Sequence, residues 1–185
     1  MTLRMTGPRT VPEPGRVYLR AVSGEDRQEF LKLMRASQHL HYPWISPPVT
    51  EATFTGYLNR TRREDHEGLL VCTRSDDAIA GVININNIVR GSFLSASLGY
   101  YAGAPFAGQG LMREGLELVK SYAFFSLGLH RLEANIQPDN HRSIALVQQC
   151  GFEREGLSHD FLYIDGKWRD HERWTVVHNR TALRP

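Results

Sequence analysis

One segment near the middle of the chain constrains the fold most, because it predicts a strand, a long helix and a second strand in that order. The run Leu111–Phe125 has no internal proline and carries apolar residues at helical spacing. A strand is expected to end at about Ala102 before it, and His130–Gln137 predicts a short strand after it. Two strands joined by a helix lie parallel in one sheet, so we expect a parallel crossover.

The other segments predict antiparallel strands and further helices around this crossover. Val17–Val22 fits a strand, and residues 23–26 supply helix caps before apolar residues at helical spacing. Further strands are expected at 68–73, 79–88 and up to 102, a hairpin within 152–177, and helices at 50–63 and 142–150. The expected architecture is one α/β domain, α+β in some schemes, with a mixed and mostly antiparallel sheet.

Length and composition agree with one domain. The chain has 185 residues, of which 41% are hydrophobic and 23% charged, as in globular proteins. We expect a flexible arm at 1–15, the domain at 16–178 and a tail at 179–185. The formal charge of +2 is too small to predict nucleic-acid binding, and no apolar run reaches the length of a membrane span. The protein is expected to be cytoplasmic, as a monomer or homodimer.

Metal-ligand patterns are not found in the sequence. Cys72 and Cys150 lie in apolar contexts without metal-ligand spacing, so both are expected to be buried thiols. His39 and His41 share a loop, but no cysteine or carboxylate beside them completes a ligand set. We therefore expect no metal.

A glycine turn opens the long helix. In the stretch PFAGQGLM the two glycines allow close approach of a ligand, and the N–H groups of about 108–113 suit an anion. An ordinary strand-to-helix turn is the alternative. A Walker loop is excluded because Gln109 and Gly110 stand where lysine and serine or threonine are needed. Arg113 stands where a dinucleotide fingerprint needs a third glycine.

Two motifs in this order resemble those of the GCN5-related N-acetyltransferases. These are PFAGQGLM before the long helix and PDNHRSIALVQQCGF after the following strand, and the tail GFEREGLSHDFLYIDGKWRDH is similar to the Rim-type ribosomal-protein-alanine N-acetyltransferases. The resemblance covers roughly residues 17–178. It implies a single GNAT domain whose sheet splays at a central parallel pair, with helices on both faces. Two departures are that Ala107 and Met112 replace the usual turn residues, and that Val147 replaces a tyrosine.

The resemblance implies acetyl-CoA as the acetyl donor. The pantetheine arm would pair with the strand before the turn, through the backbone amides of Tyr100 and Tyr101. The pyrophosphate would lie on the turn, where Arg113 could contact phosphate or solvent. The implied cofactor contacts in and beyond the turn are Ala107, Gly108, Gln109, Gly110, Leu111, Met112, Arg113 and Asn140.

The resemblance also implies catalytic candidates. Asn140 and Ser143 match the family's Asn-x-x-Ser, so Ser143 is expected to protonate the departing thiolate, whereas Asn140 is either catalytic or a helix cap. The base stays open. Asn135 stands where one relative has its glutamate, so Glu133 is the candidate on the same strand face. Other candidates are a water chain and the carboxylates Asp160, Asp170 and Glu67.

Three functions are compatible with the sequence. The first is acetylation of the α-amine of a protein N-terminus, with a ribosomal protein as the leading candidate. The second is acetylation of a small amine such as an aminoacyl conjugate, a polyamine or an antibiotic. The third is an acyl-CoA-binding module without turnover. In the loop 37–48, Tyr42 and Trp44 could line an acceptor groove or only cover the core. The other acceptor-site candidates are Asn84, Asp160 and Asp170.

Overall fold

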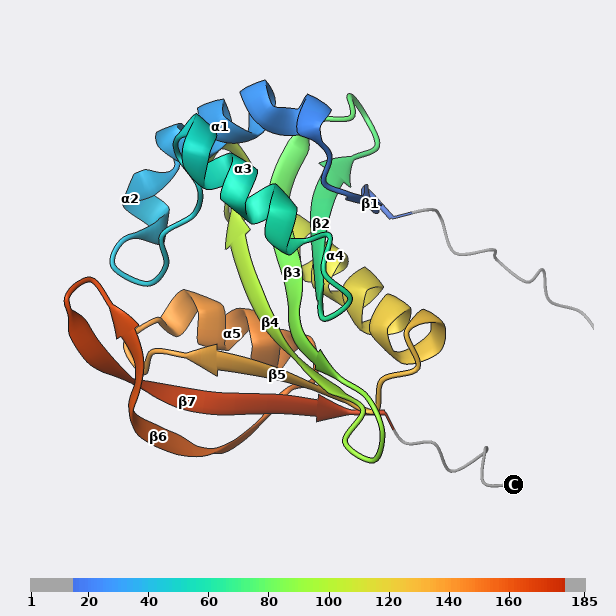
Figure 1. Cartoon of the computed structure of the whole chain (residues 1–185), viewed down its shortest axis with the longest axis vertical. Coiled ribbons are helices and arrows are strands. Elements are labelled where there is room, and N and C mark those ends of the chain that lie inside the picture. The colour runs from blue at the N-terminus through green and yellow to red at the C-terminus, as the bar shows by residue number, and fades with distance from the viewer. Residues whose placement is uncertain (1–14, 179–185) are drawn as a thin grey trace, which may run out of the picture.

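The computed structural model describes residues 15–178. The expected arm, apart from Gly15, and the expected tail lie outside these residues. Within them, seven strands form one sheet in the order β1-β2-β3-β4-β5-β7-β6 (Figure 1). Strands β4 (Ser95–Ala102) and β5 (Arg131–Ile136) are parallel, and the other neighbouring pairs are antiparallel. The predicted mixed sheet with a parallel crossover is confirmed.

The remaining elements follow the predicted order. The strands are β1 (Val17–Ala21), β2 (His66–Thr73), β3 (Ile79–Val89), β6 (Glu153–Ile164) and β7 (Lys167–Val177). The helices are α1 (Arg27–Ala36), α2 (Gln38–His41), α3 (Glu51–Arg60), α4 (Leu111–Ser121) and α5 (His141–Gln149). No helix among the described residues is both long and apolar enough to span a membrane.

Two elements differ from their predictions. The long helix is α-helical only to Ser121, and Tyr122–Ser126 continues it as a π-helical turn. The N–H of Leu127 donates to the carbonyl of Tyr122 five residues earlier, at 3.0 Å, so this end is wound more widely than an α-helix. The loop 37–48 also begins with the short helix α2 before its prolines.

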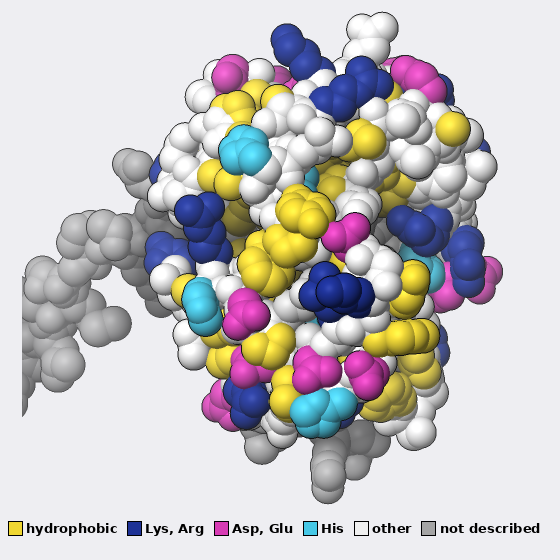
Figure 2. All heavy atoms as spheres, turned by 90° about the vertical axis from the view of Figure 1, so that its left-hand side faces the viewer, with side chains coloured by type: hydrophobic (Ala, Val, Ile, Leu, Met, Phe, Trp, Pro, Cys, Tyr) yellow, Lys and Arg dark blue, Asp and Glu magenta, His cyan; other side chains and the backbone are white. Residues whose placement is uncertain are grey.

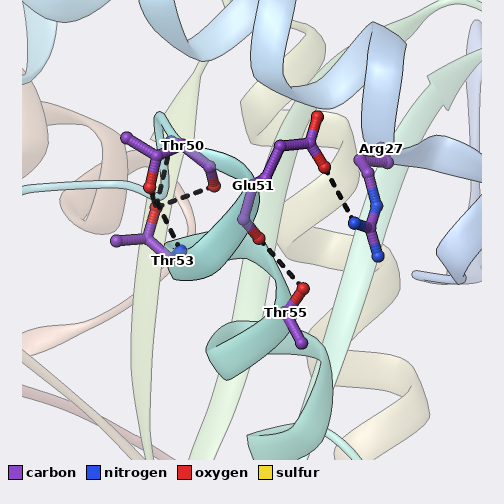
Figure 3. A network of polar contacts seen from close by, with 5 residues as sticks. All are labelled: Arg27, Thr50, Glu51, Thr53 and Thr55. Carbon is purple, nitrogen blue, oxygen red and sulfur yellow. Dashed lines mark hydrogen bonds and ion pairs between the residues drawn. The ribbon is translucent and has the colours of Figure 1, made fainter.

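Reciprocal hydrogen bonds between Thr50 and Thr53 cap the start of helix α3 (Figure 3). The Thr50 hydroxyl accepts the Thr53 N–H at 3.2 Å, and the Thr53 hydroxyl accepts the Thr50 N–H at 3.0 Å. Glu51 accepts a hydrogen bond from Arg27 of α1 at 2.8 Å. These contacts fix the helix start and join it to α1, so the end of the loop that follows α2 has a defined position.

Two apolar clusters hold the helices on opposite faces of the sheet, as the resemblance implied. Ile83 and Ile85 of β3 contribute to the cluster that contains Leu116 of α4. Val82, which alternation turns to the other face, contributes to the cluster that contains Phe30 of α1. Helices α4 and α5 therefore cover one face, and α1 and α3 cover the other (Figure 1).

The sheet opens between its two parallel strands. Residues 95–98 of β4 pair with residues 131–134 of β5, and the pairing stops there. Among the strands that the structure describes, the rest of β4, from Gly99 to Ala102, pairs only with β3. Figure 1 shows β4 turning away from β5 and β7 beyond this point. One side of Gly99–Ala102 is thus an open strand edge, as the resemblance implied.

Candidate active site

A small cavity lies at the point where β4 and β5 separate. It includes residues of both strands, of the loop after α2, and of the start of α5. A larger cavity, of about 490 Å³, lies between the end of α3 and the start of β2 and contains no residue of the two motifs. The small cavity is therefore the candidate active site, because it alone joins the open strand edge to the second motif.

The glycine turn requires left-handed backbone at two positions. Gly108 has φ of +75° and Gly110, the N-cap of α4, has φ of +79°, which side chains with a Cβ adopt at a cost. A Cβ on Gly108 would meet no atom within 4 Å, so the space beside it is open. The first N–H groups of α4 have no acceptor within the helix, so they are available to bind a pyrophosphate beside the turn.

Side chains around the turn hold its shape. Gln109 donates to the Pro105 carbonyl at 2.8 Å, and its own carbonyl accepts from Arg16 at 2.9 Å. Arg16 also pairs with Glu114 in the first turn of α4. Sequence reasoning missed Arg16, which lies about ninety residues from the turn along the chain. Arg113 is exposed, so its side chain is accessible to a phosphate and to solvent.

The apolar residues of the turn pack inward. Leu111 is buried, and Met112 lies against Gly81 of β3, where a Cβ would come within 2.3 Å of the methionine sulfur. Gly81 therefore lets the start of α4 approach the sheet. The side chains of Leu111 and Met112 pack in the protein interior. These two residues can therefore contact a cofactor only through their backbone amides.

Two hydroxyl groups meet in the cavity. The hydroxyl oxygens of Tyr100 on β4 and Ser143 on α5 are 2.6 Å apart. Burial raises the pKa of Tyr100 above its ordinary value, so the phenol stays protonated at neutral pH. The Ser143 N–H donates to Asn140 Oδ1 at 3.2 Å. Asn140 therefore caps α5 while lining the cavity, and Tyr100 contributes its side chain as well as its backbone.

The candidate carboxylates are engaged elsewhere. Glu133 accepts from Arg131 at 2.7 Å, and Glu67 accepts from the Tyr122 hydroxyl at 2.8 Å. No Asp or Glu is among the described residues that line the cavity. Asp170 accepts from the Asp160 N–H at 2.9 Å and pairs with His159, which lowers its pKa, and the structure brings neither aspartate into the lining.

The acceptor-site candidates lie in different places. Trp44 lines the cavity, and its carbonyl accepts from Gln137 at 3.4 Å. Tyr42 is 66% exposed, and its hydroxyl donates to Asp165 at the tip of the β6–β7 hairpin at 3.0 Å. Asn84 accepts from the Tyr57 hydroxyl of α3 at 2.7 Å and is not in the lining. The loop after α2 thus connects the cavity to the hairpin.

The cavity holds two hydrogen-bond acceptors, of which sequence reasoning missed His171 and named Asn135 only as the residue in place of a relative's glutamate. His171 on β7 is buried, and its Nδ1 is 2.9 Å from the Arg169 carbonyl oxygen. Burial lowers its pKa below the ordinary 6.5. Asn135 on β5 has a buried Oδ1 with no hydrogen-bond partner among the described residues. The alternation of β7 is a signal for His171. Only the pairing of β5 with β7, which sets Asn135 opposite Arg173, brings His171 and Asn135 to the same cavity.

Comparisons with known proteins agree with this site. A family model for the acetyltransferase (GNAT) domain matches residues 16–153. The ribosomal protein uS5-alanine N-acetyltransferase of Escherichia coli (strain K12) is 34% identical over 166 residues, which are 84% of each chain. The probable N-acetyltransferase YjcK of Bacillus subtilis (strain 168) is 35% identical over 123 residues, 66% of this chain and 68% of the relative.

A solved structure shows the same fold. Mycobacterium smegmatis RimJ in complex with CoA-disulfide is 26% identical, superposes with a TM-score of 0.81, and covers 90% of this chain and 84% of its own. A splayed mixed sheet with a glycine turn at the start of α4 defines an acetyl-CoA-dependent N-acetyltransferase. The chain belongs to the acetyltransferase (GNAT) domain family.

The residues of the site fit acetyl-CoA, and those that the structure describes there do not form a metal ligand set. The open space beside Gly108 and the unpaired edge of Gly99–Ala102 match a pyrophosphate and a pantetheine arm. Within residues 15–178, no group of three His, Cys, Asp or Glu side chains is placed to hold a metal ion.

Proposed function

We propose that the chain acetylates the α-amine at the N-terminus of a protein, and that this protein is a ribosomal one. The observation that carries the proposal is the similarity to the uS5-alanine N-acetyltransferase, which extends over 84% of both chains.

The surface beside the cavity supports a large acceptor. Tyr42, Tyr163 and Trp168 are 60–66% exposed, and the last two contact each other across the tip of the β6–β7 hairpin. Hydrophobic side chains interspersed with charged ones gather on this side of the molecule (Figure 2). Exposed aromatic side chains of this kind suit contact with a polypeptide, whereas a small amine would fill only the cavity.

The proposed chemistry uses groups that the site already holds. The turn binds the pyrophosphate, and the open edge of β4 binds the pantetheine arm, so that the thioester lies near Ser143. The acceptor nitrogen forms a bond to the acetyl carbon, and the carbon–sulfur bond breaks with its electron pair on sulfur. Ser143, hydrogen-bonded to Tyr100, donates to that sulfur as negative charge develops.

An acceptor panel tests the proposal. The purified protein is given acetyl-CoA with peptides that begin in alanine or serine, the same peptides with a blocked N-terminus, and spermidine. Thiol release and the mass of the products are measured. We expect acetylation of the free α-amine alone. Acetylation of spermidine without any reaction of the peptides would instead establish a small-amine enzyme, and acetyl-CoA binding without thiol release from any amine would contradict both.

A further inference from the structure

We propose that Nε2 of His171 is the general base that takes the proton from the acceptor amine. This inference rests on the proposed function, since it requires an amine acceptor. It supplies the group that the carboxylates do not, because His171 lines the cavity with Ser143 whereas Glu133, Asp160 and Asp170 do not.

The contacts of His171 leave one nitrogen available. The Arg169 carbonyl oxygen can only accept, so Nδ1 carries the proton and donates it at 2.9 Å. The tautomer with a proton on Nδ1 has its lone pair on Nε2. Nothing among the described residues hydrogen-bonds to Nε2. His171 is 3% exposed, and its ring packs against Phe161 with ring centroids 5.7 Å apart, so the orientation of the ring is fixed.

The surroundings of His171 keep it neutral. Burial has the largest effect and lowers its pKa, while the hydrogen bond to the Arg169 carbonyl and the charge of Asp170 raise it less. A neutral imidazole can accept a proton at neutral pH, and an imidazolium cannot. Asp170 is next to His171 on β7, and Arg169 and Arg173 share its strand face by alternation. Tyr100 of β4 lines the same cavity, and His159 of β6 is paired with Asp170.

A second acceptor in the cavity points to the same ligand. Asn135 Oδ1 is buried with no hydrogen-bond partner within residues 15–178, and burial of an acceptor without a partner is unfavourable. Together with Nε2 of His171, it gives the cavity two acceptors and calls for a ligand with at least two N–H groups. A primary amine meets this requirement: it donates one N–H to Asn135 and one to His171, and its lone pair remains for the acetyl carbon.

The proton balance closes with these residues. As the C–N bond forms, the nitrogen gains positive charge and loses a proton to Nε2. The electron pair of the broken C–S bond stays on sulfur, which takes a proton through Ser143. The imidazolium then returns its proton to water, and water restores the serine. The net result is amide and thiol from amine and thioester.

The test variant is His171→Asn. An asparagine amide places an N–H close to the position of Nδ1, so the bond to the Arg169 carbonyl can persist, while nothing replaces Nε2. We expect kcat to fall by about a hundredfold or more. The KM for acetyl-CoA and the melting temperature should change little. The control is His178→Gln, because His178 follows the same strand but stacks on Phe124, away from the cavity.

The pH dependence separates a base from a structural residue. A peptide α-amine titrates near pH 8, so kcat/KM falls about tenfold per pH unit below that value in any variant. In the parent the fall becomes steeper, by a further tenfold per unit, below the lowered pKa of His171. His171→Asn should lose this steeper region, and His178→Gln should keep it.

The outcomes distinguish the two proposals. If His171→Asn keeps its kcat within threefold of the parent, or keeps the steep acid limb, His171 is not the base and the proposed function stands. If the parent itself acetylates no amine, the proposed function fails and the base assignment fails with it.

Discussion

Ser143 and Tyr100 place two hydroxyl groups next to the expected position of the thioester. A leaving thiolate needs a donor only as the C–S bond breaks, so loss of that donor should slow turnover without weakening binding. Ser143→Ala is expected to lower kcat about a hundredfold and to leave the Kd for acetyl-CoA unchanged. Thiol release and a binding titration measure the two effects. A turnover within about threefold of the parent would leave Ser143 as a helix-start residue only.

Tyr100 is expected to act through Ser143. Its phenol can donate to the Ser143 oxygen only while protonated, and its raised pKa keeps it protonated, so it orients the serine hydroxyl. Tyr100→Phe should lower kcat by tenfold or more, yet have no further effect in a Ser143→Ala background. Tyr122→Phe, which removes a tyrosine hydrogen bond to Glu67 outside the cavity, is the control. Additive losses in the double variant would show that the two hydroxyls act independently.

The start of α4 depends on Gly110 for its conformation. Valine at φ of +79° is strained by about 1–2 kcal/mol, and its Cβ would lie 3.3 Å from Arg16, which braces the turn. Gly110→Val should therefore displace the N–H groups of the helix start and abolish acetyl-CoA binding. Gly91→Val carries the same strain, at φ of +74° in open space, and should bind normally. Calorimetric titration of both variants measures the difference, and equal Kd values would place the phosphate site elsewhere.

Elements with local signals could be predicted from the sequence, and contacts between distant segments could not. The glycine turn, the cap at Thr50 and the hairpin at Asp165 depend on a few adjacent residues. The choice of partner by a side chain depends on the whole fold: Glu133 is taken by Arg131, which also pairs with Glu155. Because these contacts cannot be read from the sequence, sequence reasoning proposed several carboxylates as the base and did not include His171.

At the scale of the whole molecule, the parallel pair is where the two halves of the sheet meet. Strands β1–β4 form an antiparallel half with α1 and α3 on one face, and β5–β7 form a second antiparallel half. Only four residues of β4 pair with β5, so the halves share a short ladder. A ligand that extends this ladder contacts both halves, and its binding energy adds to the stability of the folded chain.

Acetyl-CoA should accordingly raise the melting temperature. A ligand that binds only the folded state, at about 100 times its Kd, adds about 2.7 kcal/mol. For a domain of this size that corresponds to roughly 5–10 °C. Thermal unfolding with acetyl-CoA, CoA and ATP measures the shift, and Gly91→Val should show it while Gly110→Val should not. CoA should act like acetyl-CoA, because both carry the pyrophosphate and the pantetheine arm, whereas ATP lacks the arm that extends the β4 edge. A larger shift with ATP than with acetyl-CoA would contradict the assignment of the open β4 edge to pantetheine.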